Sequence, residues 1–264
     1  MTSVQLIGGP TALIEWGGLR LLTDPTFSVV GVHESAPGRP LTKLEPPALL
    51  PDQVLPVDAV LLSHDQHADN LDPAGRQMLA SVPLVLTTPE AALRLGGNAR
   101  ALGTWQDTQL SGPGGQPITI TAVPARHGPP GCEPLTGTVT GFVLSAPDLP
   151  TVYVSGDNAS LDAVTQVAER FGPVEIALLF AGAARTSLFG GTALTLTSAD
   201  AARAAVILGT CHVVALHVRG WAHFSEGPDT VSSAFAHAGI ADKLTNPVPG
   251  ETAHWPDGPN ARSG

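Results

Sequence analysis

Five segments of this 264-residue chain end in the same way, with a short apolar run that stops at, or within a few residues of, a histidine or an aspartate. The residues at these stops are Asp24, His64, His127, Asp157 and His217. Short apolar runs predict buried strands, and the loops beyond strand ends can converge on one edge of a sheet. Any one of these residues alone is more often a turn residue or a helix cap. Five such endings together predict one shared site.

The pattern between these stops predicts an α/β protein. Strands are predicted at residues 4–7, 11–16, 19–23, 57–62, 82–87, 118–123, 138–144, 151–155, 174–180 and 212–216. Helices are predicted at residues 73–80, 91–95, 161–171, 198–208 and 229–237. Two halves, each running from strands into strand–helix units, predict a four-layer αββα sandwich. No linker separates the halves, so we expect residues 1–264 to form a single domain.

Residues 28–50 are rich in proline and glycine and show no clear period. We expect a long loop here, and loops of that length inside a compact domain are usually functional or mobile.

The composition excludes several functional classes. The formal charge is −10, from 13 Lys and Arg against 23 Asp and Glu, which argues against a general nucleic-acid surface. The two cysteines form no CxxC pair and predict no disulfide framework. The first residues carry no signal-peptide pattern, and no apolar run is long enough to cross a membrane. We therefore expect a cytoplasmic protein with a small-molecule substrate.

The densest part of the pattern is residues 63–72, which read Ser-His-Asp-Gln-His-Ala-Asp-Asn-Leu-Asp. Imidazole and carboxylate together suit Zn²⁺, Mn²⁺ or Fe²⁺, whereas cysteine would favour a closed structural zinc site. A catalytic site keeps one position open for water, and the metal lowers the pKa of that water from ~15.7 toward ~7. These residue types predict one or two divalent metal ions, with zinc as the first expectation and manganese or iron as alternatives.

Taken together, these stops resemble the motifs of the metallo-β-lactamase superfamily, and the resemblance runs from Asp24 to Glu251. The matching residues are Asp24 in LLTDP, His127 in PARHG, Asp157 in YVSGDN and His217 in VALH. The resemblance implies the αββα fold and a metal-dependent hydrolase. It also implies a metal site built from His64, His67, Asp69, His127, Asp157 and His217.

Two finer expectations come from the same resemblance. Asp24 would not bind metal itself but would orient a ligating imidazole, and Asp157 would bridge two metals. The segment Pro249-Gly250-Glu251 resembles the end of the branch that contains L-ascorbate-6-phosphate lactonase and N-acyl-phosphatidylethanolamine phospholipase D.

The family's second motif, HxHxDH, is altered in this chain. His64 and His67 are three residues apart instead of two, and Asn70 stands where the last histidine is expected. Either a one-residue bulge lets His64 reach the metal, or Asp65 replaces it as an oxygen ligand. We favour His64, because histidine is the better ligand for a borderline metal. Asparagine is a weaker ligand than histidine, so the count of one or two metals stays open.

Three residues are predicted to assist catalysis: Asp69, His223 and Asp24. Asp69 would orient or deprotonate the attacking water. His223 follows His217 closely and is either the last metal ligand in its place or a substrate contact. Arg126 and Arg185 are candidates for holding an anionic group.

Three functions compete at this stage. The first is a hydrolase that uses a metal-activated water on a lactone, an ester or a phosphodiester. The second is a degenerate, non-catalytic metal-binding member, for which the altered second motif is the best support. The third is a nuclease-like phosphodiesterase similar to ribonuclease Z, which the net charge disfavours. Lactonase relatives suggest a homo-oligomer, although the sequence shows no interface signature.

Overall fold

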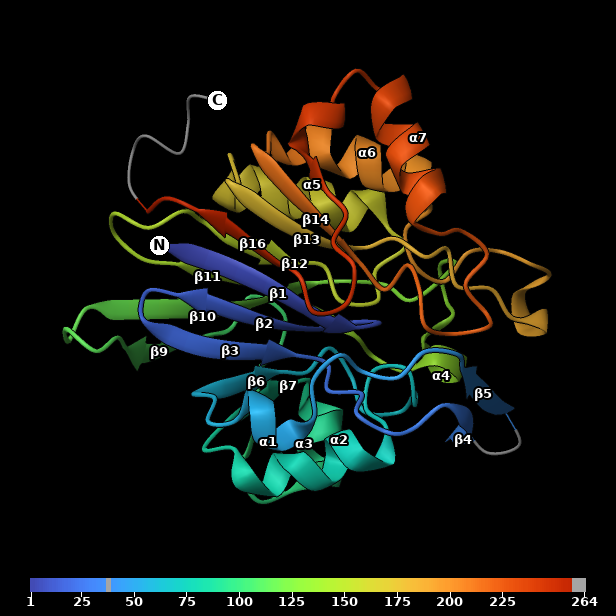
Figure 1. Cartoon of the computed structure of the whole chain (residues 1–264), viewed down its shortest axis with the longest axis horizontal. Coiled ribbons are helices and arrows are strands. Elements are labelled where there is room, and N and C mark those ends of the chain that lie inside the picture. The colour runs from blue at the N-terminus through green and yellow to red at the C-terminus, as the bar shows by residue number, and fades with distance from the viewer. Residues whose placement is uncertain (37–38, 258–264) are drawn as a thin grey trace.

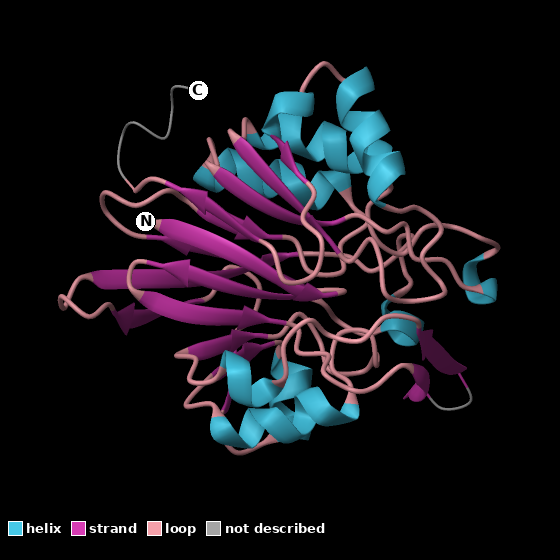
Figure 2. Cartoon of the chain, viewed as in Figure 1, coloured by secondary structure: helices cyan, strands magenta, loops and turns pink. Residues whose placement is uncertain are grey.

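The computed structural model describes residues 1–36 and 39–257, and places two seven-stranded sheets face to face. Figures 1 and 2 show the two sheets in the middle of the molecule and a group of helices on each outer side. Both sheets mix parallel and antiparallel pairs. The predicted αββα sandwich is thus confirmed.

The first sheet has the strand order β16-β1-β2-β3-β6-β7-β8. Its strands are β1 (Thr2–Gly8), β2 (Thr11–Trp16), β3 (Leu19–Thr23), β6 (Ala59–Leu61), β7 (Val85–Thr87), β8 (Ala99–Ala101) and β16 (Thr252–Trp255). Helices α1 (Pro51–Val54), α2 (Pro73–Met78) and α3 (Pro89–Leu95) lie on its outer side, with a 3₁₀ turn at Leu79–Ser81. Helix α2 begins where predicted, because the Asp72 carboxylate accepts from Gly75 N and Pro73 occupies the first turn.

The second sheet has the order β15-β14-β13-β12-β11-β10-β9. Its strands are β9 (Asp107–Ser111), β10 (Pro117–Pro124), β11 (Thr140–Ser145), β12 (Val152–Val154), β13 (Ile176–Phe180), β14 (His212–Leu216) and β15 (Leu244–Thr245). Helices α5 (Leu161–Phe171), α6 (Ser198–Leu208) and α7 (Pro228–His237) cover it, whereas α4 (Glu133–Thr136) lies apart from them. Short 3₁₀ turns stand at Ser187–Phe189 and Ala241–Lys243.

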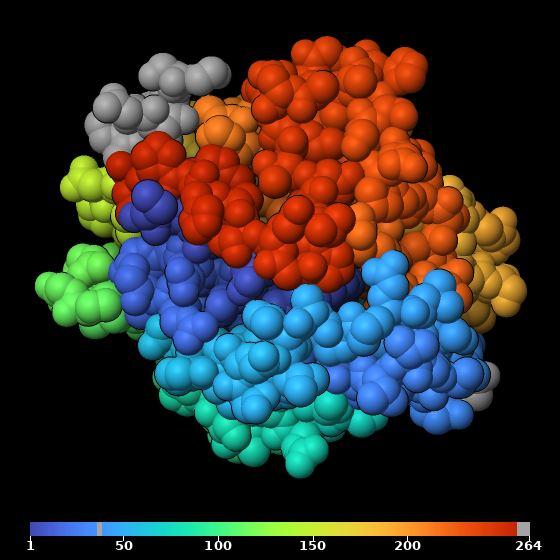
Figure 3. All heavy atoms as spheres, viewed as in Figure 1, coloured from blue at the N-terminus to red at the C-terminus, as the bar shows by residue number. Residues whose placement is uncertain are grey.

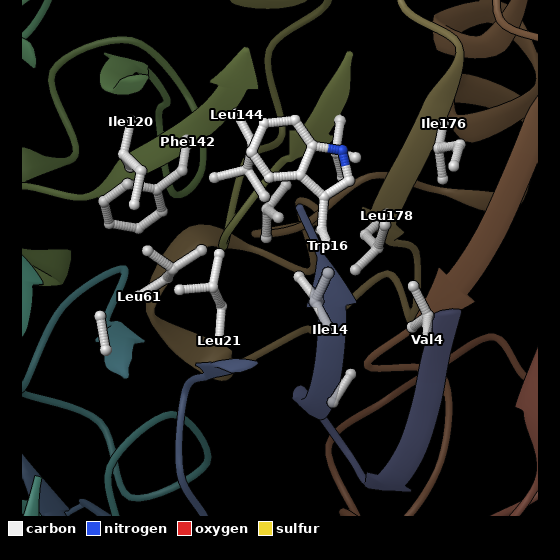
Figure 4. Packing of buried hydrophobic residues seen from close by; sticks show 14 of the residues in the cluster. Val4, Ile14, Trp16, Leu21, Leu61, Ile120, Phe142, Leu144, Ile176 and Leu178 are labelled. Carbon is white, nitrogen blue, oxygen red and sulfur yellow. The ribbon is translucent and has the colours of Figure 1, made fainter. Parts of the chain in front are cut away.

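The core consists of three apolar layers, one between the sheets and one under each group of helices. Figure 4 shows the middle layer, where Ile14 and Trp16 of the first sheet face Leu144 and Leu178 of the second. Trp16 is fully buried, and its indole nitrogen donates to the Pro150 carbonyl at 2.8 Å. Burying a side chain of this size contributes about 1.5–3 kcal/mol. This rigid double sheet carries the strand ends described below.

The expectation of an unstructured loop at residues 28–50 was wrong. This segment contains a two-stranded hairpin of β4 (Gly31–Ala36) and β5 (Arg39–Lys43). The hairpin has an irregular register, and exposure in β4 does not follow residue type, since Val32 is 68% exposed whereas His33 is half-buried. The sequence of β4 therefore lacks the apolar–polar alternation that predicts a strand. Beyond it, Leu44 N donates to Gly220 O at 2.7 Å and Ala222 N to Thr42 O at 3.0 Å. Figure 3 shows blue N-terminal segments and orange C-terminal segments in contact on the face of the molecule that it presents.

None of the helices in the described part of the chain is long and apolar enough to cross a membrane.

Candidate metal centre

The loops that follow the strands meet at one edge of the sandwich, and their acidic and histidine side chains form two clusters there. The first consists of His64, His67, His127 and Asp157, and the second of Asp69, Asp157 and His217. Within each cluster, one ligand-type atom per residue lies within 4.8 Å of all the others. Asp157 belongs to both clusters. Every residue of the metal set predicted from the sequence is therefore in one cluster or the other.

The first cluster is a triangle of imidazoles. The ring centroids of His64, His67 and His127 are 4.8–5.5 Å apart. His64 Nε2 lies 2.8 Å from His67 Nδ1, so this pair can share a proton or a cation. His127 Nδ1 lies 2.8 Å from the Leu194 carbonyl oxygen. Donation to that carbonyl would leave His127 Nε2 as a free lone pair, the usual arrangement for a metal-binding histidine.

The unusual spacing between His64 and His67 is absorbed by a bend at residues 65–66. Asp65 turns the opposite way and becomes the buried partner of arginines. Arg94 Nε lies 3.1 Å from both carboxylate oxygens of Asp65, with a further contact from Arg94 Nη2, and Arg76 Nη2 lies 3.7 Å away. The structure therefore does not bring Asp65 into either cluster.

Asp24 acts on His64 through Ser63. One carboxylate oxygen of Asp24 accepts from Ser63 N at 2.6 Å, and the other accepts from Ser63 Oγ at 2.8 Å. His64 Nδ1 lies 2.9 Å from the same hydroxyl. When His64 Nδ1 donates to Ser63 Oγ, the His64 Nε2 lone pair is left facing the first cluster. Burial raises the pKa of Asp24 to about 7, although the hydrogen bonds from Ser63 oppose this shift.

The second cluster is held by contacts between carboxylates and imidazoles. His217 Nδ1 lies 3.0 Å from Asp157 Oδ1, and His217 Nε2 lies 3.3 Å from Asp69 Oδ2. His223 Nε2 lies 3.0 Å from the same Asp69 oxygen. Asn70 lies between Asp24 and Asp157: its Nδ2 donates to Asp24 Oδ2 at 3.1 Å and to Asp157 Oδ1 at 3.2 Å.

The two clusters differ in their electrostatics. Burial, together with the charges of neighbouring imidazoles, lowers the pKa of His64 well below its usual value and that of His67 to about 4. Burial would also lower the pKa of His217, but the charge and close contacts of Asp157 and Asp69 outweigh it and raise that pKa to about 10. At neutral pH His64 and His67 are thus neutral imidazoles, whereas His217 is protonated until a cation displaces the proton.

Several buried polar atoms of the clusters have no hydrogen-bond partner among the described residues. They are Asp69 Oδ1, Asp157 Oδ2 and both ring nitrogens of His217, although the His217 nitrogens are ion-pair neighbours of Asp157 and Asp69, and Asp157 Oδ2 is an ion-pair neighbour of His127. A buried polar atom left without a hydrogen bond costs about 1–3 kcal/mol, so a native structure seldom leaves several such atoms together without a compensating partner. Nitrogen and oxygen donors in this mixture suit a borderline divalent cation. The residues present therefore fit a bound metal.

The backbone is strained where it positions these side chains. His217 has φ of +56° and Asp24 has φ of +26°, a region that residues with a side chain rarely adopt. Gly156, with φ of +55°, lets the Asp157 loop approach Ser63 closely, since a Cβ there would lie 2.9 Å from Ser63 Cβ and 2.5 Å from Thr140 O.

A cleft opens over the clusters and holds about 480 Å³ of non-protein space, part of it continuous with solvent. His67, Asp69, His127 and His223 form its polar side. The remaining walls are mostly apolar and come from Leu41, Leu135, Thr136, Ala184, Thr186, Leu188, Phe189 and Leu194, with Ser35 and Arg39 of the hairpin. The cleft therefore presents the candidate metal residues to a ligand with an apolar body.

Some predicted site residues lie elsewhere. Arg126 Nε donates to Gly128 O, and Arg185 Nε to Ser225 Oγ, and neither lines the cleft. The sequence pattern did not single out Ser63 or Arg39. Ser63 directly precedes His64, so its position was the available signal, whereas Arg39 lies in the hairpin that the sequence pattern concealed.

Comparison with known proteins identifies the family and supports the fold. Residues 19–218 match the family described as the beta-lactamase superfamily domain. The chain belongs to the beta-lactamase superfamily. Among its relatives in this superfamily, a protein of Pyrococcus horikoshii named metal-dependent hydrolase is 25% identical over 87% of this chain and 90% of its own length. An uncharacterized protein of Mycobacterium tuberculosis is 30% identical over 70% of this chain and 50% of its own length.

Two solved structures have a similar fold. The isothiocyanate hydrolase from Delia radicum gut bacteria has a TM-score of 0.80 and 25% identity, covering 96% of this chain and 99% of that one. A metallo hydrolase from Ignicoccus hospitalis has a TM-score of 0.69 and 21% identity, covering 96% and 97%.

Proposed function

We propose that this member of the beta-lactamase superfamily is a metal-dependent hydrolase of a small, uncharged lactone or ester. The observation that carries the proposal is the pair of clusters sharing Asp157 on the polar side of an apolar cleft. The name of the Pyrococcus horikoshii relative, a metal-dependent hydrolase, supports the reaction class.

A divalent cation held here would supply Lewis-acid chemistry, because it acidifies water and polarises the electrophile. The chain's own residues do the rest. His64, His67 and His127 provide nitrogen donors that are neutral or oriented by a backbone carbonyl. Asp69 lines the cleft and has Oδ1 without a hydrogen bond, so it can orient the attacking water. Burial favours its protonated form, but His223 and His217 outweigh burial and hold the pKa of Asp69 well below its usual value, so it is a weak proton acceptor.

The cleft wall favours a neutral substrate over a phosphodiester. Arg39 is the one lysine or arginine among the cleft-lining residues that the structure describes, whereas sites that bind phosphate esters use several cationic or amide donors. The lactone candidate draws on the resemblance of Pro249-Gly250-Glu251 to the ascorbate-phosphate lactonase branch. Those three residues do not line the cleft, and Gly250 N donates to Leu6 O of β1 at 2.7 Å, so they contribute to the fold.

A second candidate substrate is a neutral isothiocyanate. The Delia radicum gut-bacterial enzyme acts, by its name, on isothiocyanates, and this chain resembles it over nearly its full length. An isothiocyanate carries one electrophilic carbon and an organic side group, which suits a cleft walled by leucine and phenylalanine.

Turnover assays test the proposal. The protein would be loaded with Zn²⁺ or Mn²⁺ and given a nitrophenyl ester, an aliphatic lactone, bis-nitrophenyl phosphate and an aryl isothiocyanate, with His237→Ala on exposed α7 as a control. We expect chelator-sensitive turnover of the ester, lactone or isothiocyanate. Absence of all turnover in a fully metal-loaded protein would favour the degenerate alternative, and turnover of the phosphodiester alone would favour the nuclease-like one.

A further inference from the structure

Residue 70 stands where the family's second motif ends in a histidine, but its side chain has another task. Asn70 Nδ2 is committed to two carboxylates, Asp24 and Asp157. The Asn70 side chain therefore fixes the Asp157 carboxylate by a hydrogen bond and offers the second cluster no imidazole. That cluster is left with Asp69, His217 and a share of Asp157.

An imidazole from a different part of the chain, outside the cluster as defined above, contacts one of its members, Asp69. His223 Nε2 lies 3.0 Å from Asp69 Oδ2, and His217 Nε2 lies 3.3 Å from the same oxygen. Two imidazole nitrogens therefore flank a single carboxylate oxygen. In the first cluster, two imidazole nitrogens also lie close together, because His64 Nε2 is 2.8 Å from His67 Nδ1.

The loop that carries His223 is fixed on both sides. Its neighbours form isolated bridges, Trp221 with Lys43 of β5 and Phe224 with Ala184. The carbonyl oxygen of His223 accepts from Arg185 N at 3.0 Å. The Phe224 ring packs against the His217 ring at a centroid distance of 4.4 Å and against the His223 ring at 4.7 Å. Since backbone and ring are both held, His223 is preorganised as a donor.

Among the residues that the structure describes, no other imidazole outside the two clusters is placed to contact Asp69. Of the nine histidines, three belong to the first cluster and His217 to the second. His33 packs on Trp221, His212 packs on Trp255, and His237 and His254 are exposed.

We propose that His223 supplies the donor that position 70 lacks, so that Asp69, Asp157, His217 and His223 together form a second cation site. The inference rests on the cation-binding clusters of the proposed function but not on any substrate. Of the two roles that the sequence left open for His223, metal ligand or substrate contact, this assigns the first. His217 stays a ligand beside it. Asn70 becomes a positioning residue that holds Asp157 between the two sites.

Metal counting tests this assignment without any activity assay. Metal-free protein would be titrated with Co²⁺, with visible absorbance and elemental analysis giving the equivalents bound. Wild type, His223→Ala, the double variant Asn70→His with His223→Ala, and the control His237→Ala would be compared. Co²⁺ would be held at one hundred times the Kd of the second wild-type site. We expect two equivalents for wild type and His237→Ala, about one for His223→Ala, and a return toward two in the double variant.

Two results would overturn the inference. One is a wild-type protein that never binds more than one equivalent, and the other is a His223→Ala protein whose second site is at least half filled at that Co²⁺ concentration. Neither depends on the double variant, which places a larger side chain at a buried position. A wild type that binds two equivalents and hydrolyses nothing would defeat the proposed function and leave this inference standing.

Discussion

His64 Nε2 and His67 Nδ1 lie 2.8 Å apart, although the two residues are separated by one position more than the family's second motif allows. The bend at residues 65–66 takes up the extra residue and sends Asp65 to Arg94. An insertion that shifts a strand or helix would disturb every later side chain. In this loop it leaves both imidazoles facing one point.

His67→Ala should remove the cation of the first cluster, because His64, His127 and Asp157 would be left to hold it with an open side. We expect one metal equivalent fewer by elemental analysis, with the far-ultraviolet circular dichroism of wild type. His237→Ala, on the exposed face of α7, should keep the wild-type metal content. Full metal retention in His67→Ala would show that His67 is not a ligand.

Asp24→Asn should weaken metal binding without removing any ligand. The two carboxylate oxygens of Asp24 accept from Ser63 N, Ser63 Oγ and Asn70 Nδ2. The amide of asparagine would turn one of these acceptor oxygens into a donor nitrogen. Loss of a partner behind a ligand typically lowers metal affinity about 10–100-fold. A competition titration with a chromogenic chelator measures this. An affinity within twofold of wild type would mean that Asp24 does not orient His64.

Arg94→Ala should lower stability and leave the metal content unchanged. The Asp65 side chain is 3% exposed, and Arg94 is its closest partner. Leaving a buried acceptor without its donor costs about 1–3 kcal/mol, reduced here because Arg94 itself is partly exposed. Urea unfolding of the metal-free protein measures the cost, with Arg203→Ala, an exposed i,i+3 pair, as a control expected below about 1 kcal/mol. Loss of metal in Arg94→Ala would instead point to Asp65 as a ligand.

The two cation sites should respond differently to pH. The pKa of His67 is lowered to about 4 and that of His64 lies well below its usual value, so these two ligands are already deprotonated at neutral pH and should add no pH dependence to the affinity of the first site between about pH 6 and 9. His217, with a pKa raised to about 10, must release a proton to bind a cation. Affinity at the second site should therefore rise about tenfold per pH unit up to about pH 10. Calorimetric titrations at three pH values measure both, and a flat profile at the second site would contradict the raised pKa.

Long buried elements were predictable from the sequence, and short exposed ones were not. Strand β13 (Ile176–Phe180) and helix α6 (Ser198–Leu208) follow from an apolar run and from the Thr197 cap. Strands β8, β9, β15 and β16, with helices α1 and α4, were missed because each spans five residues or fewer and is largely exposed. Local pattern carries little signal at that length, and tertiary pairing decides the outcome.

The site shows the same division. The cluster residues were predictable because each chemically distinctive side chain follows a buried strand. The contact between Asn70 and two carboxylates, and the approach of His223 to Asp69, depend on loops from three parts of the chain meeting in space. The apolar cleft wall was not predictable, because leucine and phenylalanine in a loop look the same whether they pack or bind. The expected cytoplasmic location and homo-oligomer stay predictions.

The central claim is that two cation sites share one carboxylate, and Asp157→Ala tests it most directly. Asp157 belongs to both clusters and is fully buried. Elemental analysis after loading with excess Zn²⁺ and gel filtration should find bound zinc in wild type and almost none in a folded Asp157→Ala protein. A folded Asp157→Ala protein that carries the wild-type amount of zinc would contradict the account.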